Sequence, residues 1–144
     1  MSARIEWSKQ VPEAYQAMLG LEQALATSGL EPSLLELVRL RASQINGCAF
    51  CVNMHANDAR KGGETEARLQ TLSVWRETSF FDARERAALD WVESLTELPT
   101  KHVQQVQYNA LREHFNESEI VNLTLAIAII NAWNRFGVGF AMKP

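Results

Sequence analysis

Two cysteines and one histidine lie at spacings that place them on one side of a helix. Cys48 and Cys51 are the two cysteines of the 144-residue chain, and His55 follows four residues after Cys51. Residues three or four positions apart are neighbours on a helix surface, so both thiols and the imidazole are expected in one stripe. Asn46-Gly47 predicts a helix end just before Cys48, which places the pair in the first turn of the next helix. Free backbone N–H groups and the helix dipole stabilise a thiolate there, and Cys-X-X-Cys pairs commonly have a lowered thiol pKa.

An acidic residue completes this group. Glu36 lies in the preceding predicted helix, twelve residues before Cys48. Because a tight turn separates the two helices, we expect an antiparallel return that brings Glu36 close to His55. A carboxylate bonded to one imidazole nitrogen fixes the tautomer and raises the basicity of the ring. The predicted site therefore consists of Cys48, Cys51, His55 and Glu36, with His55 accepting a proton from a thiol.

Three other interpretations of the cysteines compete with this one. Cys48, Cys51 and His55 are possible zinc ligands, with His102 or His114 as the fourth, but zinc modules usually show a second ligand pair at a characteristic spacing. A purely structural disulfide closing so short a loop would add little stability, and inert buried cysteines would not explain the spacing to His55. We therefore predict redox-active thiols, with no bound metal and no cofactor.

Helix signals cover most of the chain, and no segment shows the sustained alternation of a strand. Asp82 with Glu85, and Asn116 with Glu119, have the spacing of helix-capping boxes. The segment 75–81 is aromatic and is interpreted as a connection. The predicted helices cover residues 12–27, 32–45, 48–61, 64–72, 83–98, 101–115 and 117–137. The sequence thus predicts an all-α protein of six or seven helices.

Composition narrows the class of protein. Fourteen Lys and Arg residues stand against seventeen Asp and Glu, giving a net charge of −3, which argues against nucleic-acid binding. The first twenty residues lack the apolar core of a secretion signal. The most apolar segment, 120–133, is shorter than the roughly 20 residues that a membrane-spanning helix needs. We therefore expect a single cytoplasmic domain over residues 1–144, with no membrane partner.

The last predicted helix is apolar almost all round, which a domain of this size seldom covers alone. A homo-oligomer is therefore expected. The same helix carries a polar and aromatic cluster of Asn131, Trp133, Asn134 and Arg135. Two interpretations of this cluster remain open: it lines the thiol site, or it satisfies buried backbone and partner groups.

The spacing Glu36, Cys48-X-X-Cys51, His55 resembles the active-site signature of the AhpD-like alkylhydroperoxidases, a branch of the carboxymuconolactone decarboxylase superfamily. The similarity extends over about residues 31–140, including the segments 39–44, 55–62 and 130–135. The resemblance implies the AhpD-like helical fold and assembly into trimers or hexamers, of which the hexamer is the favoured state.

The resemblance also implies roles for the residues. Cys51 would be the thiol oxidised by peroxide, Cys48 would donate a proton and then close a Cys48–Cys51 disulfide, and Glu36 and His55 would relay protons. Phe50 stands where characterised relatives carry a second histidine, which removes one member of the relay. Helix-dipole reasoning alone makes Cys48 the more acidic and exposed thiol. The two assignments agree if Cys48 faces solvent for reduction while Cys51 lies inward beside His55.

The predicted function is that of a thiol-dependent peroxidase or disulfide oxidoreductase. Its substrate would be a hydroperoxide, and an external dithiol of lipoyl or thioredoxin type would restore the thiols. Three alternatives are a redox sensor, a metal-binding structural protein and a non-peroxidase member of the superfamily. Members of the decarboxylase branch lack the cysteine pair, which argues against lactone decarboxylation.

Overall fold

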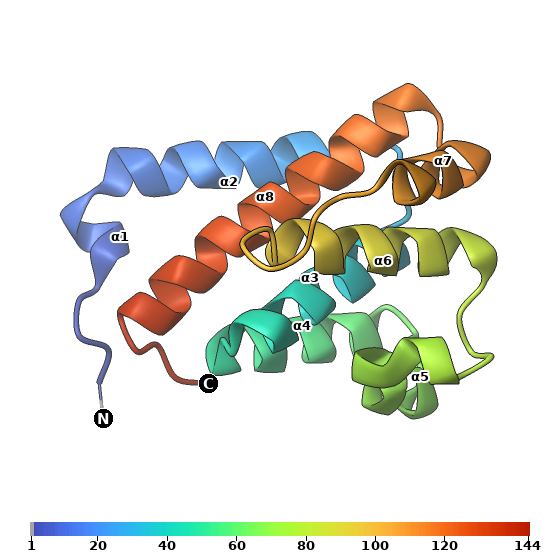
Figure 1. Ribbon diagram of the computed structural model, residues 1–144. Helices are drawn as coiled ribbons and strands as arrows, with labels where there is room; N and C mark the ends of the chain where they lie inside the picture. The colour runs from blue at the N-terminus through green and yellow to red at the C-terminus, as the bar shows by residue number, and fades with distance from the viewer. Residues whose placement is uncertain (1) are drawn as a thin grey trace.

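The computed structural model describes residues 2–144, which form one all-α domain without strands (Figure 1). Six of its eight α-helices have ten or more residues, in agreement with the predicted fold class. In chain order the elements are α1 (Trp7–Gln10), α2 (Pro12–Ala26), α3 (Pro32–Asn46), α4 (Ala49–Lys61), α5 (Glu66–Thr71), the 3₁₀ helix η1 (Leu72–Glu77), α6 (Ala83–Thr96), α7 (Gln105–His114) and α8 (Glu117–Gly139).

The helix starts follow the capping signals of the sequence. Asp82 and Glu85 form a reciprocal capping box at the start of α6, and Asn116 and Glu119 form one at the start of α8. Each such cap stabilises a helix by about 1 kcal/mol, because it satisfies N–H groups that have no partner within the helix. The capping prediction is confirmed at both places.

Three features of the secondary structure differ from the prediction. The short helix α1 was not predicted, and the connection around Trp75 contains η1, which is kinked at Val74. α7 begins at Gln105 instead of residue 101, because Gln104 and Gln107 form a capping box that fixes its first turn. No helix in residues 2–144 is long and apolar enough to cross a membrane.

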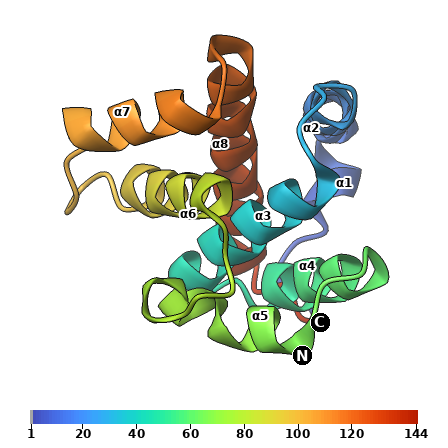
Figure 2. The same cartoon turned by 90° about the vertical axis from the view of Figure 1, so that its right-hand side faces the viewer.

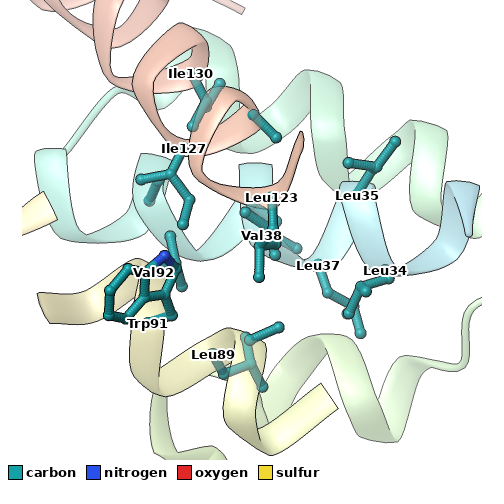
Figure 3. Packing of buried hydrophobic residues seen from close by; sticks show 14 of the residues in the cluster. Leu34, Leu35, Leu37, Val38, Leu89, Trp91, Val92, Leu123, Ile127 and Ile130 are labelled. Carbon is teal, nitrogen blue, oxygen red and sulfur yellow. The ribbon is translucent and has the colours of Figure 1, made fainter. Parts of the chain in front are cut away.

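α3 lies at the centre of the core and packs against α4, α6 and α8. Figure 3 shows its buried side chains Leu34, Leu37 and Val38 among side chains of α6 and α8. Burying a leucine stabilises the fold by about 1.5–3 kcal/mol, so α3 is held firmly between its neighbours. The side chains of α6 and α8 that complete this contact are Leu89, Trp91, Val92, Leu123, Ile127 and Ile130.

The N-terminal helices cover the opposite side of α8. Figure 2 shows α1 and α2 on one side of α8, with α6 and α7 on the other. Leu25 is the one fully buried residue of α2, which packs chiefly against α8. The two N-terminal helices therefore form an outer wall over one face of α3, α4 and α8.

Candidate active site

The α3–α4 hairpin brings the predicted site residues together. Gly47 ends α3 in the left-handed conformation (φ 66°), which glycine adopts at little cost, and the chain reverses there. Asn46 supports the turn by donating hydrogen bonds to the side-chain oxygens of Asn131 and Asn134, both at 2.9 Å. The turn is thus anchored to α8, and Cys48 follows as the N-cap of α4.

Cys48 and Cys51 form a disulfide in this structure, with their Cα atoms 5.2 Å apart. The backbone N–H of Cys51 donates a hydrogen bond to Cys48 Sγ over 3.3 Å. Cys48 is 1% exposed and Cys51 3% exposed. The expectation that Cys48 faces solvent is therefore wrong: as the N-cap, its side chain turns back over the first turn of α4 and is covered by α8.

His55 and Glu36 are in contact, as the antiparallel hairpin predicts. His55 Nδ1 lies 2.8 Å from Glu36 Oε2. Because an ionised carboxylate only accepts hydrogen bonds, Nδ1 carries the proton, which leaves Nε2 to exchange one. His55 itself is buried, one helical turn after Cys51.

A longer chain of charges continues behind this pair. Arg39 donates to Glu36 Oε1 over 2.8 Å and to Glu22 Oε2 over 2.7 Å. The indole N–H of Trp133 donates to the other oxygen of Glu22 over 3.0 Å. Sequence reasoning assigned neither residue to the site. Glu22 joins it from α2 only through folding, whereas Arg39 lies three residues after Glu36 on α3, a spacing that could have indicated the contact.

The pKa of Glu36 reflects these partners. Burial raises the pKa of this carboxyl group, but the hydrogen bond and charge of His55, together with Arg39, outweigh burial and hold the pKa below its ordinary value. Glu36 is therefore ionised at neutral pH and accepts the hydrogen bond from Nδ1 of His55.

A cavity of about 570 Å³ reaches one cysteine of the disulfide. Cys51 and His55 line this cavity, whereas Cys48 does not. The residues that line it come from α1, α2, α3, α4, α8 and the chain ends, and most of these residues are apolar. The aromatic residues that line it are Trp7, Tyr15, Phe50, Trp133 and Phe136.

Two residues of this region escaped sequence analysis. A Cβ atom at Gly137 would lie 2.5 Å from Cys48 Sγ and 3.2 Å from Cys51 Sγ, so α8 approaches the disulfide through a position without a side chain. Trp7 stacks on Phe136 with ring centroids 3.9 Å apart and forms part of the cavity wall. No sequence signal marks either residue, because both act across contacts between distant parts of the chain.

The members of the polar and aromatic cluster on α8 have different roles, so each of the two interpretations holds for some of them. Trp133 lines the cavity. Asn131 and Asn134 are structural: they bind the α3–α4 turn and also donate to Thr96 and Ser43. The remaining member, Arg135, is exposed and bonds to Asn131 within α8.

The two histidines that a zinc site would have needed as its fourth ligand lie away from the cysteines. His102 lines a separate polar groove beside α6 and α7, and His114 ends α7. Within residues 2–144, the acidic, histidine and cysteine side chains close enough to share one ion are Glu36, His55 and Asp58. Both oxygens of Glu36 already bind His55 and Arg39, so this group is explained by the ion pairs of the site.

The family of the chain follows from its match to a family model. The model described as the carboxymuconolactone decarboxylase family matches residues 12–94, which is more than half of the sequence. The chain therefore belongs to the carboxymuconolactone decarboxylase family. This confirms the family that the spacing of Glu36, the two cysteines and His55 indicated.

Other proteins are similar to this chain in sequence or in fold. The uncharacterized protein YdfG of Bacillus subtilis is 41% identical over 99% of this chain and 97% of its own length. A solved structure from Agrobacterium tumefaciens, of a protein of unknown function provisionally described as the antioxidant defence protein AhpD, is 43% identical with a TM-score of 0.95, and the match covers 99% of both chains. The debrominase Bmp8 is 19% identical with a TM-score of 0.83 over 92% of this chain and 72% of that protein, which shows a shared fold alone.

Proposed function

We propose that the protein is a thiol-dependent peroxidase in which Cys51 reduces a hydroperoxide. The observation that carries this proposal is the position of Cys51, the cysteine that lines the cavity, beside an imidazole whose Nδ1 is bound by Glu36 at 2.8 Å. A nucleophilic thiol needs a base within reach and a third group that orients the base. His55 and Glu36 fit these two roles.

The oxidative half-reaction begins from the dithiol form. His55 Nε2 accepts the proton of the Cys51 thiol, and the thiolate attacks the distal oxygen of the hydroperoxide. The O–O bond breaks, its electron pair leaves with the alkoxide, and Cys51 becomes a sulfenic acid. The protonated His55, oriented by its hydrogen bond to Glu36, returns the proton to the alkoxide and releases an alcohol.

Cys48 completes the oxidative half of the cycle. Its sulfur attacks the sulfenic sulfur of Cys51, an S–S bond forms, and water leaves. The Cys48–Cys51 pairing in the structure is the product expected of this step. An external dithiol then restores both thiols, so we place the protein in the cytoplasm, where thiols are kept reduced.

The cavity favours a neutral, apolar hydroperoxide. Side chains such as Ile130, Phe136 and Met142 line it, and burial of apolar surface contributes about 25 cal/mol per Å². The ionised side chains along its walls are Glu6, Lys9, Glu22, Glu36, Arg39 and Asp58, in which acids outnumber bases. An anionic substrate would be repelled by this excess of negative charge.

We also propose a homo-oligomer, a hexamer or a trimer. α8 buries most of its apolar residues within one chain, but Val121 on α8 and Val106 on α7 remain 66% exposed. Light scattering of the purified full chain measures the mass. A monomer at micromolar concentration contradicts this part of the proposal.

The decisive experiment mixes reduced protein with cumene hydroperoxide in a stopped-flow instrument. Wild type should consume peroxide rapidly, Cys51→Ser should lose this activity, and Cys48→Ser should retain a single turnover that stops at the sulfenic acid. Cys48→Ser is the matched control, because it makes the same replacement of sulfur by oxygen at the other cysteine of the pair. If Cys51→Ser consumes peroxide as fast as wild type, the proposal is wrong.

Two alternatives are separated by the same variants. A debrominase shares this fold, so a non-peroxidase member of the superfamily is the first alternative. A non-redox activity of such a member would survive the loss of both cysteines. A redox sensor would form the Cys48–Cys51 disulfide once per oxidant and show no turnover with any reductant.

A further inference from the structure

Glu22 on α2 connects two parts of the site that lie on different helices. Its Oε2 accepts a hydrogen bond from Arg39 on α3 over 2.7 Å, and its Oε1 accepts one from the indole N–H of Trp133 on α8 over 3.0 Å. Arg39 leads to Glu36, the partner of His55, whereas Trp133 lines the cavity. Each oxygen of this one carboxylate therefore serves a different part of the site.

The bond to Glu22 controls how Arg39 binds Glu36. Arg39 uses one guanidinium nitrogen for each carboxylate, over 2.8 Å to Glu36 Oε1 and over 2.7 Å to Glu22 Oε2. A guanidinium and a carboxylate otherwise favour two parallel hydrogen bonds, so without Glu22 the guanidinium is able to take both oxygens of Glu36. One of these oxygens, Oε2, lies 2.8 Å from Nδ1 of His55 and accepts its hydrogen bond. Glu22 thus keeps this oxygen available to the base.

The bond to Glu22 also orients the ring of Trp133. This indole packs against the rings of Trp7 and Tyr15, whose centroids lie 5.7 and 5.9 Å from its own. All three rings line the cavity. The N–H bond selects one orientation of the indole, because turning the ring would give up this hydrogen bond. The shape of the cavity wall therefore depends on Glu22.

We propose that Glu22 is a positioning residue that aligns the base and the substrate-binding wall with each other. It acts through Arg39 on the carboxylate that orients His55, and it acts directly on the indole of Trp133. The inference rests on the proposed peroxidase function and deepens it: an apolar hydroperoxide would rest against Trp133 while Cys51 meets its distal oxygen. The competing explanation is that Glu22 only docks α2, which predicts lower stability without a change in kinetics.

The first test replaces the carboxylate in the full chain. Glu22→Gln keeps the size of the side chain but leaves one acceptor oxygen for two donors. We expect KM for cumene hydroperoxide to rise and kcat to fall, each about three- to tenfold, because small misplacements of reacting groups are costly. Glu13→Gln is the matched control, since Glu13 is an exposed acid on the same helix and does not line the cavity. A lower Tm of Glu22→Gln with KM and kcat equal to those of Glu13→Gln overturns the proposal.

Two further variants separate the two bonds of Glu22. Trp133→Phe keeps a ring in the wall but removes the N–H donor, and it should raise KM more than it lowers kcat. Arg39→Lys keeps the positive charge but loses the planar fork that bridges two carboxylates, and it should lower kcat more than it raises KM. The same pattern in both variants would show that the two bonds have no separate effects, and this result contradicts the proposal.

Two measurements need no turnover of peroxide. The rate at which iodoacetamide alkylates Cys51 in a Cys48→Ser background reports on the base, and the Kd of cumyl alcohol, the product of cumene hydroperoxide, reports on the wall. Glu22→Gln should slow alkylation and weaken binding about three- to tenfold relative to Glu13→Gln. If wild type fails to reduce cumene hydroperoxide but both effects appear, the peroxidase function is refuted and the positioning role of Glu22 is supported. If wild type reduces the peroxide and neither effect appears, the positioning role alone is refuted.

Discussion

Gly137 offers a sharp test of how closely α8 covers the disulfide. Replacing Gly137 by alanine adds one methyl group whose carbon would lie 2.5 Å from Cys48 Sγ and 3.2 Å from Cys51 Sγ. Gly139 lies two residues further along the same helix, and a Cβ there meets nothing within 4 Å. Gly139→Ala is therefore a matched control that adds the same methyl group without the contact.

The magnitude follows from two opposing effects. Alanine favours a helix over glycine by up to about 1 kcal/mol, a gain that both variants share in part. An extra methyl group in a closely packed site costs about 1–3 kcal/mol, because neighbouring atoms must shift. We therefore expect Gly137→Ala to be less stable than Gly139→Ala by about 1–3 kcal/mol. At an unfolding entropy of about 2.1 cal/mol/K per residue, this lowers Tm by about 3–10 °C.

The assay is thermal unfolding of both variants in the oxidised form, followed by circular dichroism at 222 nm and repeated with urea. Thiol counting before each scan confirms that the disulfide is intact. Equal stability of the two variants, or a more stable Gly137→Ala, would refute the packing of α8 against the sulfurs. Lower stability confined to Gly137→Ala supports it.

Three further predictions concern the proton relay and the cavity wall. Glu36→Gln should lower the peroxidase rate by about 10²-fold, because the imidazolium of His55 loses its counter-charge. Glu22→Gln should lower this rate less, and stopped-flow measurements compare the two variants. Since folding lowers the pKa of Glu36 from its ordinary 4.5, its stabilising effect is complete above that pH and is lost as the pH falls through the lowered pKa. Urea titrations should therefore show the stability difference between wild type and Glu36→Gln shrinking towards acid pH, and a constant difference contradicts this. Trp7→Ala removes the ring stacked on Phe136 and should lower kcat/KM for cumene hydroperoxide about three- to tenfold. The rate with hydrogen peroxide should stay unchanged. Equal losses for both peroxides would show that Trp7 does not contribute to the choice of substrate.

Much of the site could be predicted because its contacts are local in sequence. Glu36 and His55 meet across a single turn, so two helices and Gly47 are enough to bring them within 2.8 Å. The helix starts at Asp82 and Asn116 were equally accessible, since a capping box involves residues three positions apart. The start of α7 was misplaced by four residues, because a glutamine at an N-cap is a weak signal.

The sequence by itself determined the all-α class, the spacing of the two cysteines and the contact between His55 and Glu36, because helical spacing and short turns act over few residues. Only the tertiary structure decided which of the two cysteines lines the cavity. Helix position alone favours Cys48 as the exposed thiol, but Gly137 on α8, more than eighty residues further along the chain, packs against its sulfur, and Cys51 is the cysteine that lines the cavity. The placement of Trp7 on Phe136 likewise depends on the docking of the N-terminal helices against α8. Contacts between such distant segments depend on how all the helices pack together, which local patterns do not encode.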